Sequence, residues 1–127
     1  ERISAFKEFK KVSQEAEGRN RRRWFSGKSI ELLVWLGIEE NELIGFQLCY
    51  DLQSTPHAFT WQKENNLLIH EKIDEGDNLP RKNLAPIMVS DGVPPIIRVK
   101  EEFERESLDV DAEIRDLVLR VFNENYP

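Results

Sequence analysis

The chain has few of the residues that would assign it to a specialised class of protein. Its 127 residues include a single cysteine, Cys49, so no disulfide can form within the chain. A lone thiol is typical of proteins from the reducing cytosol. The sequence also has no run of about 18 apolar residues, which argues against a transmembrane helix. We therefore expect a soluble cytoplasmic protein.

An excess of positive charge is missing as well. The net charge is −6, from 18 Lys and Arg against 24 Asp and Glu, whereas nucleic-acid-binding proteins normally present a basic face. One cationic cluster runs from Arg19 to Lys28 and contains the pair Trp24-Phe25. It could bind an anion or stack on bases. The acidic composition favours the other interpretation, in which the arginines follow a helix and lead into a strand with buried aromatic residues.

The sequence has no complete phosphate-binding loop. Gly27-Lys28-Ser29 matches its end, but Arg22 stands where the motif needs its first glycine. Apolar residues make up 39% of the chain and charged residues 33%, a balance typical of a folded globular domain. We expect residues 1–127 to form one domain, since a domain with a single hydrophobic core typically has on the order of 100–150 residues.

The spacing of apolar residues predicts an α+β fold. Residues 1–18 are predicted as an amphipathic N-terminal helix that ends at Gly18. Residues 23–93 are predicted as an antiparallel meander of about five strands, and residues 97–124 as one or two helices packed on it. The C-terminal helices would cover one face of the sheet. The N-terminal helix, or a second copy of the protein, could cover the other.

The segment from Ile30 to Asp51 is the predicted centre of the sheet, because it reads as two apolar strands around an acidic turn. A turn at Glu40-Asn41 places Trp35 opposite Phe46 and Leu33 opposite Leu48, which would stabilise the pair as a cross-strand ladder. The other face would then mix apolar residues with Gln47, Cys49 and Asp51. We expect a pocket or an interface on that mixed face.

A second hairpin is predicted from Ala58 to Ile73. A three-residue loop at 64–66 places five apolar side chains on one face: Phe59, Trp61, Leu67, Ile69 and Ile73. His57 would then pair with Ile73 and lie near Asp74. A fifth strand, 86–89, is closed by the turn pair Asp91-Gly92.

Few residues could carry chemistry. The catalytic candidates are Asp51, His57, His70, Asp74 and Asp91. Cys49 could pair with a histidine as a nucleophile, although a cysteine inside a strand is more typical of a small buried apolar residue. Asp51 and Asp91 could form a carboxylate pair for acid–base catalysis, or could simply stabilise turns.

No metal or cofactor is predicted. His57, His70, Asp74 and Asp77 are residue types that bind divalent cations, but their spacing matches no metal-binding signature. The segment 74–78 also has the ordinary composition of a turn and lacks the ligand order of a calcium-binding loop.

Several short segments resemble a group of small uncharacterised bacterial proteins. They are the run from Phe46 to Asp51, Trp61, His70 with Asp74 and Gly76, and the stretch from Pro86 to Gly92. The similarity covers about residues 24–122. It implies a bacterial cytoplasmic protein, and it assigns no activity and no functional residues.

The sequence thus leaves two functions open. The first is a non-enzymatic domain that binds a protein partner or self-associates through a sheet face or the N-terminal helix. The alternative is a small hydrolase or metal-dependent enzyme that uses His and Asp residues at the sheet edge.

Overall fold

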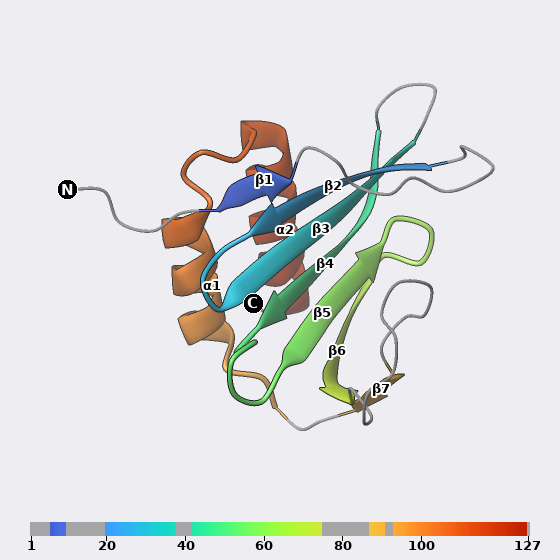
Figure 1. The fold of residues 1–127 in the computed structure, drawn as a ribbon. Coiled ribbons are helices and arrows are strands. Elements are labelled where there is room, and N and C mark those ends of the chain that lie inside the picture. The colour runs from blue at the N-terminus through green and yellow to red at the C-terminus, as the bar shows by residue number, and fades with distance from the viewer. Residues whose placement is uncertain (1–5, 10–19, 38–41, 75–86, 91–92, 127) are drawn as a thin grey trace.

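The computed structural model describes residues 6–9, 20–37, 42–74, 87–90 and 93–126. It contains one antiparallel sheet whose strands follow one another in the order of the chain, as Figure 1 shows. The seven strands are β1 (Lys7–Phe9), β2 (Asn20–Ser26), β3 (Ile30–Gly37), β4 (Leu43–Tyr50), β5 (His57–Gln62), β6 (Leu67–Asp74) and β7 (Ile87–Ser90). Two helices follow, α1 (Ile96–Glu106) and α2 (Ala112–Asn125). The predicted α+β class, antiparallel meander and C-terminal helices are confirmed.

The prediction of an N-terminal helix is wrong in the part of it that the structure describes. Lys7–Phe9 form β1, which pairs with β2, and the rest of the predicted helix lies outside the described residues. Phe6 explains the apolar signal, because its ring packs 6.4 Å from Phe25 and 6.1 Å from Phe103. Its backbone N–H also donates to the carbonyl of Glu106 over 2.8 Å. Phe6 therefore anchors an edge strand, and with β2 the sheet has more strands than the five predicted.

The central hairpin has a register one residue away from the predicted one. Val34 lies opposite Phe46 and Leu32 opposite Leu48, so Trp35 faces Gly45 instead of Phe46. Next to the turn, Leu36 pairs with Leu43, two residues away from its predicted partner, and the extra residue Ile44 in β4 reduces the difference to one along the rest of the ladder. A slip of one residue exchanges the two faces of a strand. The buried side chains of β3 and those of β4 therefore lie on the same face of the sheet.

The second hairpin is also shifted by one residue. His57 pairs with Lys72 and not with Ile73, and the loop has four residues, Lys63 to Asn66. Asn66 adopts a left-handed φ of 55°, which asparagine tolerates better than most residues. Its side-chain oxygen accepts a 2.9 Å hydrogen bond from the Trp61 indole, which fixes the longer loop.

The core lies between one face of the sheet and the two helices, which are on the same side of the sheet in Figure 1. Both helices have apolar stripes at helical spacing, and α2 buries Ile114, Leu117, Val118, Val121 and Phe122. Phe59 of β5 meets Phe122 edge-on, with ring centroids 4.7 Å apart. Burying these side chains is the main force that holds the helices on the sheet.

The opposite side of the sheet carries neither of the two described helices (Figure 1). We call it the helix-free face. One row of cross-strand neighbours crosses it from β2 to β6: Trp24, Leu33, Gln47, Thr60 and Ile69. Trp35 and Leu67 lie on the same face in the next row. This face therefore has large apolar side chains at both ends and polar side chains between them.

Candidate functional site: a groove beside α2 and a histidine cluster

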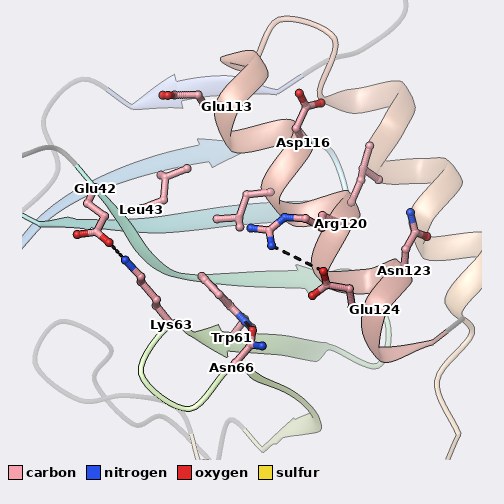
Figure 2. Close-up of a pocket in the computed structure, with 12 residues that line it drawn as sticks. Glu42, Leu43, Trp61, Lys63, Asn66, Glu113, Asp116, Arg120, Asn123 and Glu124 are labelled. Carbon is pink, nitrogen blue, oxygen red and sulfur yellow. Dashed lines mark hydrogen bonds and ion pairs between the residues drawn. The ribbon is translucent and has the colours of Figure 1, made fainter.

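A wide groove lies between α2 and the end of the sheet at the start of β4 and the β5–β6 turn, and Figure 2 shows its lining residues. Its volume is about 1180 Å³, slightly above the usual size of pockets for small molecules. The apolar part of its lining consists of Leu43, Trp61, Leu117 and Leu119. Trp61 is held in place by Asn66, as described above. The groove thus has a fixed apolar floor.

The groove is mostly acidic around that floor. Its charged lining residues are four acids and two bases: Glu42, Glu113, Asp116 and Glu124 against Lys63 and Arg120. Lys63 forms an ion pair with Glu42 on the sheet side, and Arg120 forms one with Glu124 over 3.7 Å on α2, as drawn in Figure 2. The two bases are thereby neutralised within the groove. The carboxylates of Glu113 and Asp116 leave the α2 side with a net negative charge.

The two histidines meet at the opposite end of β4 and β5. Their rings stack almost in parallel, with centroids 5.2 Å apart and an interplanar angle of 4°. The Tyr50 hydroxyl lies 2.6 Å from Nε2 of His70, and the tyrosine ring stacks on both imidazoles. Nδ1 of His57 lies 2.8 Å from the carbonyl oxygen of Thr55. Because a carbonyl only accepts, Nδ1 of His57 carries a proton and donates it.

Asp51 lies next to this cluster but binds elsewhere. Its backbone φ of 54° is in the left-handed region, where a residue other than glycine is uncommon. Its carboxylate accepts two hydrogen bonds from Arg98 of α1, of 3.0 and 2.9 Å. These bonds raise the pKa of Arg98 above its usual value. Asp51 therefore links the β4–β5 turn to α1 as an ion pair, and its carboxylate is not placed as a base for the histidines.

Cys49 is not part of a cysteine–histidine pair. It lies on the helix-free face, whereas His70 pairs with Phe59 on the covered face. Burial raises the pKa of the Cys49 thiol to about 12, so it stays protonated at neutral pH and is a poor nucleophile. Its sulfur lies 3.8 Å from the side-chain oxygen of Gln47. The structure thus favours the interpretation of Cys49 as a small, half-buried residue of the sheet over that of a nucleophile.

The remaining acidic candidates are not placed by the structure. Asp77 and Asp91 lie outside the described residues, and of Asp74 only its position at the end of β6 is described. In the part of the chain that the structure describes, no three His, Cys, Asp or Glu side chains come together as a possible metal site. The buried Tyr50 and the two histidines beside it could pass a proton.

The cationic cluster of the sequence is partly engaged in the fold. Arg23 bonds to Glu8 through 2.7 and 2.9 Å contacts and to Asp111 through a 2.8 Å contact. These carboxylates raise the pKa of the Arg23 guanidinium. Arg23 also lies 5.2 Å from the ring centroid of Phe25, which is buried. Arg23 therefore joins β1, β2 and the start of α2, and it is not available as an anion site.

Sequence reasoning did not find the groove or the partners of the histidines. Arg98, Glu113 and Asp116 were not singled out, because each lies on a helix far along the chain from the strands it faces. The only available signal was the spacing of the charged residues of α2, at 113, 116, 120 and 124, which places them on one exposed side of a helix.

No family model matches the chain, and no solved structure matches it significantly. The chain is similar to the flagellar P-ring proteins of Chromohalobacter salexigens (33% identity over 81 residues, 58% of the chain and 22% of that protein) and of Wigglesworthia glossinidia brevipalpis (31% over the same length). Several Salmonella P-ring proteins match at 38% identity over 69 residues, 49% of the chain and 19% of their length. The chain thus spans about a fifth of the length of these relatives.

The similarity contradicts the predicted cytoplasmic location, since flagellar P-ring protein is a periplasmic component. A single cysteine excludes an internal disulfide in any compartment, so it could not decide between the two locations. In the described residues, neither helix is both long and apolar enough to cross a membrane. The resemblance to small bacterial proteins is not tested by these matches and stays a prediction.

Proposed function

We propose that this protein is a non-enzymatic domain that self-associates through its helix-free face. The observation that supports the proposal is the apolar content of this face. Leu67 is 56% exposed and Ile69 is 44% exposed, and Trp24, Leu33 and Trp35 are half-buried on the same surface. Single exposed apolar residues are common, but a group of them on one face is typical of an interaction site.

The pattern of the face favours a second copy as the occupant. In the row that crosses the sheet, Gln47 and Thr60 lie in the middle and bond to each other over 3.1 Å. A two-fold axis through this middle would place Trp24 and Leu33 of one copy over Ile69 of the other. Two-fold interfaces are self-complementary in this way: if one residue of the first copy contacts a second residue of the other copy, the reverse contact forms as well. This bond already meets part of the hydrogen-bonding capacity of the polar pair, which lowers the cost of covering it.

The similarity to P-ring proteins also supports a role in an assembly, because these relatives are named for a ring of the flagellum. Their matched segment is a small part of each protein, so we carry over only the expectation that this domain contacts other chains.

The test is the mass in solution by light scattering over a range of concentrations. We expect the wild-type chain to approach twice the monomer mass, and Ile69→Lys to remain a monomer. Leu108→Lys is the matched control, since Leu108 is 70% exposed and lies between α1 and α2. A wild-type monomer at all concentrations, or an equal effect of both variants, would show that the proposal is wrong.

A further inference from the structure

The groove beside α2 has an apolar floor and a charged rim, and it lies at the end of the sheet away from the histidine cluster. Its two bases are held by Glu42 and Glu124, so the carboxylates of Glu113 and Asp116 at its rim have no cationic partner among the described residues. A ligand that fits this surface combines apolar groups with positive charge, because each part would meet its complement.

The length of the groove indicates the form of such a ligand. Glu113 and Glu124 mark its two ends along α2, and a helix rises 1.5 Å per residue, so the α2 side of the groove is roughly 16 Å long. An extended chain rises about 3.3 Å per residue, and about five residues would span that length. Successive side chains of an extended chain point to opposite sides. Every second side chain could therefore lie on the floor formed by Leu43 and Trp61.

We propose that this groove binds an extended peptide segment of about five residues in which apolar side chains alternate with lysine or arginine. The apolar side chains contact Trp61 and its neighbours, and the cations form ion pairs with Glu113 and Asp116. The site is separate from the helix-free face. Loss of one interaction would therefore leave the other intact.

The test uses a fluorescently labelled peptide of alternating lysine and leucine, with the glutamate–leucine peptide of the same length as a control ligand. Binding is measured by fluorescence anisotropy at low and at high salt. We expect the lysine peptide to bind more tightly than the glutamate peptide and its affinity to fall as salt is added, because ions screen charges at the surface.

A double variant with neutral side chains of the same shape, Glu113→Gln with Asp116→Asn, removes the two negative charges that would bind the cations and keeps the shape of α2. We expect it to weaken binding of the lysine peptide by about tenfold. The matched control is Glu101→Gln with Glu104→Asn, which removes the same charge from exposed positions of α1 outside the groove. It should leave the affinity unchanged. Circular dichroism checks that both double variants fold.

Three outcomes would overturn the proposal. They are no binding of the lysine peptide, equal binding of the two peptides, and equal loss in both double variants, which would show an effect of net charge alone. The mass measurement on the same variants separates this site from the proposed self-association, since groove substitutions should not change the mass.

Discussion

Replacing either of two adjacent leucines in β3 with alanine tests the register on which both proposed sites depend. Leu32 points into the core and is 0% exposed, whereas Leu33 lies half-buried on the helix-free face. Leu32→Ala should leave a cavity beneath the helices, at a cost of about 2–5 kcal/mol. Leu33→Ala removes a side chain that already contacts water, and its cost should be about 1 kcal/mol. The predicted register instead placed Leu33 on the ladder face and Leu32 on the face expected to carry a pocket or an interface.

Urea unfolding measures this difference. A small domain loses roughly 1–3 kcal/mol of stability per molar urea, so a gap of about 2 kcal/mol should separate the two midpoints by about 1 M. The slope should stay the same in both variants, because neither changes the area exposed on unfolding by much. A loss for Leu33→Ala equal to or larger than that for Leu32→Ala would refute the observed register. The measurement is made at low protein concentration, where self-association does not contribute.

Three further predictions follow from the described contacts. Gly45→Ala should destabilise the fold by about 1–3 kcal/mol and lower the melting temperature, because the added Cβ would lie 2.9 Å from the carbonyl oxygen of Trp61. A melting temperature equal to that of the wild type would contradict this close approach. Tyr50→Phe removes the hydroxyl that bonds to His70 and should destabilise the fold by about 1–3 kcal/mol in urea unfolding. The pKa of Cys49 is raised from 9.0 to about 12, so the folded state holds this proton more tightly than the unfolded state. The stability of the wild type relative to Cys49→Ala should therefore be constant below pH 9 and fall between pH 9 and 12, and a constant difference over this range would show that the thiol is not buried.

The sequence alone predicted the kinds of elements well where their periodicity was long. The apolar repeat of residues 112–125 indicates a helix whatever the partner is, because its stripe is wide and continuous. The short apolar run of β3, bounded by turn residues, likewise indicates a strand. The short N-terminal stripe was ambiguous, since Phe6 could serve a helix or an edge strand equally well, and only its contact with Phe103 of α1 decides between them.

The register of both hairpins was beyond sequence reasoning, because one extra residue at Ile44 and one left-handed residue at Asn66 change the pairing without changing the apolar pattern. The candidate sites depend on that register. Sequence identified His57 and His70 as candidates, but their stacking, and the Tyr50 hydroxyl beside His70, follow from β4, β5 and β6 lying side by side.

Composition and periodicity therefore determined the α+β class, the sheet at its centre and the acidic character of the surface. Tertiary structure decided which face the helices cover, where the apolar residues of the other face gather, and that carboxylates of α2 line the same groove as Trp61. The physical reason is distance along the chain. Periodicity depends on neighbouring residues, whereas a groove or a face is formed by segments far apart in the sequence, and their contacts depend on packing that no local pattern records.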